Sequence, residues 1–329
     1  MTAIAARLGR RAVSPDGVAV AAGALVLALI VARGLHVQEI PALQTFVLVL
    51  VSIVIEALPF MLVGALVSAA LAVLVSERLF ERVARLPLGI QLPGAALGAF
   101  AFPVCECGSV PVARRLIARG LHPAASLTFM FAAPILNPLV LGSTWVAYGG
   151  GRRGAEMVAA RAAVGLCASV TAGVALGRRG VLREPRSDGQ HEHADLGRFD
   201  EFAGHVTRDF LYMGRFIVLG AALSALLQSV VPQSAVSAVA TTPVVAELAL
   251  MAVAFALSLC SEADAFVAAS FGAFGAGPQL AFLVSGPIVD AKLSALYGAT
   301  FRRQFVVRLV LVAAPVIVAG SMLAGSLVR

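Results

Sequence analysis

The sequence predicts an all-α integral membrane protein made of two inverted repeats. Its composition, its long apolar segments and a set of motifs that recurs in order in the second half all indicate this class. Hydrophobic residues fill 60% of the 329 positions, charged residues fill only 13%, and the mean hydropathy is +0.93. A soluble domain is about half apolar and a quarter charged. Part of this apolar surface must therefore face a lipid bilayer.

The distribution of positive charge indicates membrane topology and not nucleic-acid binding. The net charge is +7, and the arginines lie in short runs between apolar segments. Such runs follow the positive-inside rule, which places basic loops in the cytoplasm. We therefore expect no nucleic-acid partner. The four cysteines lack the spacing of a secreted disulfide scaffold.

Apolar segments divide the chain into two membrane halves. A helix that spans the bilayer needs ~20 mostly apolar residues. The segments are Gly17–Ala32, Leu43–Val75, Leu86–Pro103, Ala124–Tyr148, Ala155–Gly177, Phe210–Val231, Val244–Leu259, Ala265–Ala276, Leu280–Ala299 and Phe305–Val328. The predicted organisation is an N-terminal cytoplasmic tail and retained first helix in 1–41, a first membrane repeat in 42–177, a charged cytoplasmic linker in 178–208 and a second membrane repeat in 209–329.

The repeat appears as a shared helix motif followed by two shared helix breaks. PFMLVGALVSAAL, beginning at Pro59, aligns with RFIVLGAALSALL, beginning at Arg215. Phe60, Gly64 and Ser68 fall on Phe216, Gly220 and Ser224. A cysteine motif and a proline motif then follow at similar distances, at Cys105 and Pro134-Ile-Leu-Asn137, and at Cys260 and Pro287-Ile-Val-Asp290. Chance similarity of small apolar residues explains this ordered recurrence poorly.

The basic loops predict that the two halves have opposite orientations. The loops near Arg78 and Arg114 are basic, whereas their second-half counterparts, 232–242 and 275–279, carry no charge. Equivalent loops on opposite sides define an inverted-topology repeat, an architecture typical of transporters. The prediction is seven crossing helices plus two re-entrant hairpins, or nine to ten helices if the hairpins cross completely.

Charged residues inside apolar segments are the first candidates for a functional site. Each costs at least ~2.5 kcal/mol on insertion scales and usually marks function. The candidates are Glu56, Glu106, Arg215, Glu247, Glu262, Asp264, Asp290 and Lys292. The alternative is internal ion pairing, of Asp290 or Glu247 with Lys292 or Arg215.

The thiols of the repeated cysteine motifs are the second candidate group. Thiolates suit soft or borderline metals, and the inverted repeat brings Cys260 toward the Cys105-Glu106-Cys107 turn. Cys105, Cys107 and Cys260 therefore form a candidate metal site near mid-membrane. The alternative is that buried cysteines act as small hydrophobic residues.

Glycine and proline mark the expected helix breaks and complete the predicted substrate site. The structural turn residues are Gly108, Pro111, Pro134, Pro138 and Pro287. Asn137 and Asp290 offer polar side chains at these breaks, and broken helices form substrate and ion sites in transporters. A packed kink is the alternative. The predicted site comprises Cys105, Glu106, Cys107, Asn137, Cys260, Glu262, Asp264, Asp290 and Lys292.

These motifs resemble those of a known family. FPVCECGSVPVARRLIARGLHPAASLTFMFAAPILNPLVL resembles the signature of the predicted permeases of the ArsP/YraQ type, and CSEADAF with GPIVDAK resembles their second repeat. The resemblance covers most of the chain after about Phe46. The matching residues are Cys105, Cys107, Gly108, Pro111, Pro134, Asn137, Pro138, Asp290 and Lys292.

The resemblance implies a multi-spanning bacterial inner-membrane permease. Some members are associated with efflux of trivalent organoarsenicals, and others act with a partner membrane subunit. Glu106 departs from the pattern, where a small residue such as serine is expected. Its carboxylate favours a metal cation over a neutral arsenic species.

The predicted function is secondary transport of a soft metal, metalloid or other thiophilic solute across the cell inner membrane, with efflux of trivalent arsenicals as the option that the resemblance implies. The sequence has no Walker loop and no hydrolase motif, so no catalytic residue and no cofactor is expected. Two alternatives stay open. One is a membrane subunit without flux of its own, and the other is a membrane thiol redox protein that uses Cys105 and Cys107.

Overall fold

The computed structural model describes residues 41–73, 76–102, 104–177, 181, 198–230 and 243–328. Every regular element of these residues is an α-helix, which confirms the predicted all-α class. The predicted first helix, Gly17–Ala32, lies outside the described residues, as does most of the predicted linker.

Six stretches of the described residues are long and apolar enough to cross a membrane. They are Leu43–Leu71, Pro123–Ala147, Gly151–Leu176, Phe202–Gln228, Ala276–Thr300 and Phe305–Gly325. Each coincides with one of the seven crossings predicted from the sequence, and the seventh is the undescribed first helix. The chain is thus a multi-pass membrane protein.

The two halves contain equivalent series of helices. In the first half these are α3 (Pro41–Val73), α4 (Glu77–Ala84), α5 (Leu88–Ala101), α6 (Glu106–Ala118), α7 (Pro123–Leu136), α8 (Pro138–Ala147) and α9 (Gly151–Leu176). In the second half they are α10 (Arg198–Val230), α12 (Pro243–Leu257), α13 (Asp264–Ser270), α14 (Ala276–Ile288), α15 (Ala291–Thr300) and α16 (Phe305–Gly325). The sequence repeat therefore pairs α3 with α10, α7–α8 with α14–α15, and α9 with α16.

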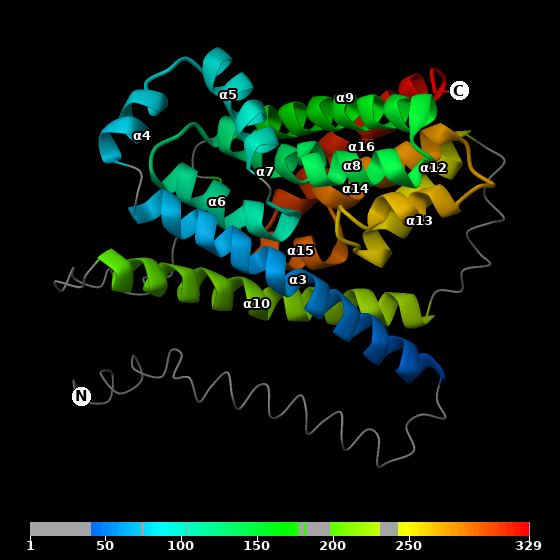
Figure 1. The fold of residues 1–329 in the computed structure, drawn as a ribbon, viewed down its shortest axis with the longest axis horizontal. Helices are drawn as coiled ribbons and strands as arrows, with labels where there is room; N and C mark the ends of the chain where they lie inside the picture. The colour runs from blue at the N-terminus through cyan, green and yellow to red at the C-terminus, as the bar shows by residue number, and fades with distance from the viewer. Residues whose placement is uncertain are drawn as a thin grey trace, which may run out of the picture.

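Equivalent helices of the two halves pack side by side and antiparallel. Helices α3 and α10 lie along each other (Figure 1), and Ser68 near the end of α3 donates to Asp209 in the first half of α10 at 2.7 Å. The end of α9 meets the start of α16, where the Arg302 N–H donates to the Val181 carbonyl at 3.3 Å. Antiparallel pairing of equivalent helices is the geometry of an inverted repeat.

The broken helices α7–α8 and α14–α15 occupy the centre of the molecule. In each of them 78% of the most apolar stretch is buried, against 17% for α3. The outer helices α3, α10 and α16 instead present exposed Leu and Val side chains, such as Leu48, Leu219 and Leu311. Such a surface suits contact with lipid.

The two predicted hairpins are α5–α6 and α12–α13. Helix α5 has 14 residues, which corresponds to about 21 Å and falls short of the ~30 Å hydrocarbon core. Figure 1 shows α4 and α5 toward one end of the long axis, and α12 and α13 toward the other. This placement supports hairpins that enter from opposite sides.

The structure corrects two expectations about local structure. Gly108 and Pro111 do not break the helix, because both lie inside α6. The break comes earlier, between the end of α5 at Ala101 and the start of α6 at Glu106. Pro111 is the sixth residue of α6, and a single proline removes one helix hydrogen bond without ending this helix. The last part of the predicted linker, 198–208, is also helical and forms about three turns at the start of α10.

Glycines related by the repeat allow two close helix crossings. A Cβ added to Gly64 in α3 would overlap the backbone of Gly108 in α6. A Cβ added to the equivalent Gly220 in α10 would overlap the backbone of Lys292 in α15. Small residues let membrane helices approach closely, which explains why this position recurs in both halves.

Gly64→Ala is therefore expected to destabilise the protein by about 1–3 kcal/mol, because the helices must separate to admit the methyl group. The measurement is thermal unfolding of purified protein in detergent. Gly214→Ala is the matched control, since its Cβ would lie an ordinary 3.6 Å from Met61 Cε. Equal midpoints for the two variants would contradict the crossing.

Candidate functional site

Both central helices are broken where the repeated proline motif predicts. Between α7 and α8, the side chain of Asn137 accepts a hydrogen bond from the Leu139 N–H at 3.0 Å. Between α14 and α15, Asp290 accepts from the Leu293 N–H at 2.6 Å. Each polar side chain thus caps the second half of its helix, which satisfies an N–H that the break would leave without a partner.

A buried lysine lies beside the second break and connects it to both hairpins. Lys292 Nζ donates to Glu106 Oε1 at 2.8 Å, and to the carbonyls of Ser258 at 3.1 Å and Leu259 at 3.2 Å. Asp290 Oδ2 is 3.6 Å away. The side chains of Lys292 and Glu106 are each 1% exposed. All three ammonium protons therefore have partners inside the protein.

Local structure explains why these partners point at Lys292. Glu106 is the first residue of α6, where the helix dipole stabilises a carboxylate. Its second oxygen accepts from Ser261 Oγ at 3.0 Å. Ser258, directly after α12, has a φ of 49°, in a region that non-glycine residues adopt rarely. The two hairpin turns thus meet at one ion pair.

A second buried ion pair lies close by and was not anticipated from the sequence. Arg161 in α9 donates to both carboxylate oxygens of Asp264, at 3.0 and 2.7 Å. It also donates to Thr144 Oγ1 at 2.8 Å and to the Ser261 carbonyl at 3.3 Å. Ser261 therefore contacts both ion pairs. The sequence does contain a sign of this pair, because Arg161 lies in the middle of the apolar segment Ala155–Gly177. A charged residue inside such a segment is a candidate functional or structural residue like the others.

Several acidic side chains near the two pairs keep oxygens without a hydrogen-bond partner. Both carboxylate oxygens of Glu262 are in this state among the described residues, and so is Asp290 Oδ2. Glu56, in α3, is half-buried. Such carboxylates can take up a proton or a cation.

The three predicted thiols are all buried in this region, whereas Cys167 is exposed. Cys105 and Cys107 are each 1% exposed, and Cys260 is 3% exposed. Within the described part of the chain, no three His, Cys, Asp or Glu side chains are grouped as metal ligands. The metal site of Cys105, Cys107 and Cys260 stays a prediction.

Two of the charged candidates lie in other surroundings. The Arg215 guanidinium lies over the rings of Tyr212 and Phe216, at 4.7 and 4.9 Å from their centroids. Glu247 is 2% exposed, and its Oε2 has no hydrogen-bond partner among the described residues. Of the internal pairs considered from the sequence, the one formed is Lys292 with Asp290, and Glu106 is the closer partner of Lys292.

Tyr148, directly after α8, supports the end of this central region. Burial raises the pKa of its phenol above the usual range, so the group stays protonated. It donates to Gln279 Oε1 at 2.9 Å. Gln279 in turn donates to the Phe271 and Phe274 carbonyls at 3.0 Å each. The Tyr148–Gln279 bond therefore connects the first half of the molecule to α14 and, through Gln279, to the loop before α14.

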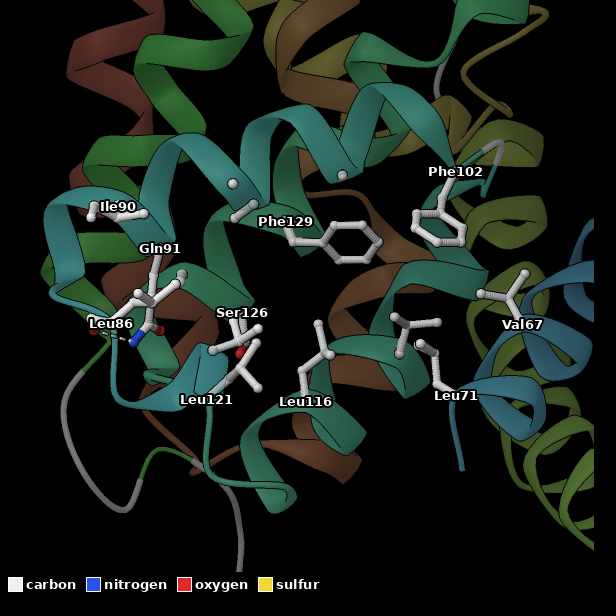
Figure 2. Close-up of a pocket in the computed structure, with 16 residues that line it drawn as sticks. Val67, Leu71, Leu86, Ile90, Gln91, Phe102, Leu116, Leu121, Ser126 and Phe129 are labelled. Carbon is white, nitrogen blue, oxygen red and sulfur yellow. Dashed lines mark hydrogen bonds between the residues drawn. The ribbon is translucent and has the colours of Figure 1, made fainter. Parts of the chain in front are cut away.

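An apolar cavity elsewhere is unsuited to an ion. It has a volume of about 290 Å³ and lies between α5 and helices α3, α6 and α7. Figure 2 shows that side chains such as Val67, Leu116 and Phe129 line it. Both of its polar side chains are engaged, because Gln91 donates to the Leu86 carbonyl at 2.8 Å and Ser126 donates to the His122 carbonyl at 3.4 Å. Such a cavity fits hydrocarbon, so the candidate site remains at the ion pairs.

Membrane-spanning helices, central helix breaks and buried charges define a polytopic protein of the transporter class. The family described as "predicted permease" matches residues 42–326, and the chain belongs to this family. Membership of the predicted permease family indicates a transporter rather than an enzyme.

Curated relatives support this assignment over most of the chain. A Bacillus subtilis protein named UPF0718 protein YcgR is 36% identical over 283 residues, which cover 84% of this chain and 95% of the relative. A Streptococcus mutans protein, provisionally named a two-component membrane permease complex subunit, is 33% identical over 272 residues, which cover 80% and 89%. No solved structure matches.

Proposed function

We propose that this chain is a cell inner-membrane secondary transporter, with a cytoplasmic N-terminus, that moves a small thiophilic solute such as a soft metal or metalloid. Soft metal cations, which the Glu106 carboxylate favours, and trivalent arsenicals, which the family resemblance implies, are the solutes to test. The observation that carries the proposal is the buried contact between opposite hairpin turns through Glu106 and Lys292 at 2.8 Å. The thiols of Cys105, Cys107 and Cys260 are buried around this contact.

The geometry suggests how a solute would pass. The Glu106–Lys292 pair and its Ser258 and Leu259 carbonyl partners join α6, the α12–α13 turn and α15. Because the two hairpins belong to different repeats, rocking of one repeat against the other would separate this contact. A solute that binds the thiols would enter when the pair opens. The partnerless oxygens of Glu262 could accept a coupling proton.

Cys105→Ser and Cys107→Ser are each expected to lower transport at least tenfold, because serine oxygen is a poor ligand for a soft metal. The measurement is uptake of Cd²⁺, Ag⁺ and trivalent arsenicals into proteoliposomes, with and without a pH gradient. Cys167→Ser is the matched control, because Cys167 is exposed. Wild-type rates in both variants for every transported solute would remove the thiols from the site.

The Streptococcus mutans relative supports a second candidate function, that of a permease subunit that acts with a partner membrane subunit. Proteoliposomes distinguish the two functions. Flux by this chain alone supports the first candidate. Flux that appears only after co-purification with a second membrane protein supports the second.

A further inference from the structure

A basic cavity opens at the arginine-rich end of the molecule, between α6, α10 and α15. Its volume is about 430 Å³. Among the described residues that line it are four arginines and one carboxylate, Arg114, Arg115, Arg119, Arg208 and Asp209. Four positive charges against one negative charge leave an excess of three, which favours an anion.

The single carboxylate is already engaged and does not neutralise the remaining arginines. Asp209 accepts from Arg115 at 2.8 Å and from Ser68 at 2.7 Å. Arg114 lies over the Tyr212 ring at 5.4 Å, an arrangement that leaves the edge of the guanidinium able to donate. Arg208 lines the cavity and is exposed. Arg114 and Arg208 are thus the charges available to a ligand.

A buried hydroxyl on the wall of the cavity also lacks a partner. Thr300 lines the cavity, is 5% exposed, and its Oγ1 makes no hydrogen bond within the described residues. A buried hydroxyl normally has a partner. Its position beside an excess of positive charge points to a ligand with acceptor oxygens.

The cavity adjoins the central ion pair. Residues four apart share a helix face. On α6, Val110 and Arg114 line the cavity one and two turns beyond Glu106. On α15, Leu296 and Thr300 line the cavity one and two turns beyond Lys292. The cavity therefore lies along the same two helix faces as the Glu106–Lys292 contact.

We infer that this cavity is a binding site for an oxyanion, formed by Arg114, Arg208 and Thr300. Guanidinium and hydroxyl donors match the acceptor oxygens of sulfate, phosphate or a phosphate headgroup. Binding at this cavity does not depend on the transported solute, so it can be tested apart from transport.

The test uses the full-length protein in neutral phosphatidylcholine nanodiscs, with sulfate titrated by calorimetry at constant ionic strength. Saturable binding is expected, weakened at least fivefold by Arg114→Gln or Arg208→Gln and less by Thr300→Val. Arg153→Gln is the matched control, because Arg153 is exposed near the start of α9 and should leave binding unchanged.

A second titration, in phosphatidylglycerol nanodiscs, distinguishes the source of the anion. If sulfate binding disappears there and returns in phosphatidylcholine, the headgroup occupies the same site. If binding is equal in both, the site takes a free oxyanion. The absence of sulfate binding in phosphatidylcholine, or wild-type affinity in Arg208→Gln, would overturn the inference.

Discussion

Replacing Lys292 with methionine is expected to abolish transport and to destabilise the protein by about 3–5 kcal/mol, the usual cost of removing one partner of a buried ion pair. Lys292 is 1% exposed and donates to Glu106 and to two backbone carbonyls. Without it, the Glu106 carboxylate would keep Ser261 as its side-chain partner. The two hairpin turns would also lose the contact that joins them.

Thermal unfolding and proteoliposome flux test this prediction. The double variant Glu106→Gln with Lys292→Met removes both charges, so it should recover most of the stability. Its transport should stay absent, because the charged pair is the proposed site. A single Lys292→Met variant with wild-type flux would show that the pair is not required.

Arg161→Met is expected to destabilise the protein to a similar degree, by about 3–5 kcal/mol, through loss of a structural bridge. The Arg161 side chain is fully buried and binds Asp264 through both carboxylate oxygens. It also holds the α12–α13 turn through the Ser261 carbonyl. The unpaired Asp264 carboxylate would remain buried near the start of α13.

The two ion pairs should respond differently to removal of both charges. The sequence predicted Asp264 as a substrate ligand, but Arg161 engages both of its carboxylate oxygens, so we expect this pair to support the turn. Arg161→Met with Asp264→Asn should therefore recover most of the stability and also most of the transport. The surface pair of Arg152 and Glu156 is the control, since the Arg152 side chain is 83% exposed and such pairs contribute little. An unchanged unfolding midpoint in Arg161→Met would contradict a structural role.

The sequence predicted the membrane elements well because their signals are local. Apolar length identified the crossings that the structure describes, and the two short apolar helices coincide with the predicted hairpins. Proline followed by Asn137 or Asp290 located the central breaks to within a residue. The turn residues Gly108 and Pro111 were assigned wrongly, because both lie inside α6, where Gly108 allows the close crossing with Gly64 of α3.

Residues that the repeat aligns do not always have the same partners. Ser68 donates to Asp209 and accepts from Arg115, which connects α3, α6 and α10. The equivalent Ser224 donates to the Ala256 carbonyl at 2.5 Å near the end of α12. Similar helices in the two halves thus form different contacts, and a sequence alignment of the halves cannot show this difference.

The sequence by itself determined the class of protein, the positions of its helices and hairpins, and the repeat that relates its halves. These depend on apolar length, charge and helix breaking, which act over a few turns of chain. Only the tertiary structure decided the partners of the buried charges. Glu106 and Lys292 are 186 positions apart, and Arg161 and Asp264 are 103 apart, so their pairing depends on how the helices pack in three dimensions.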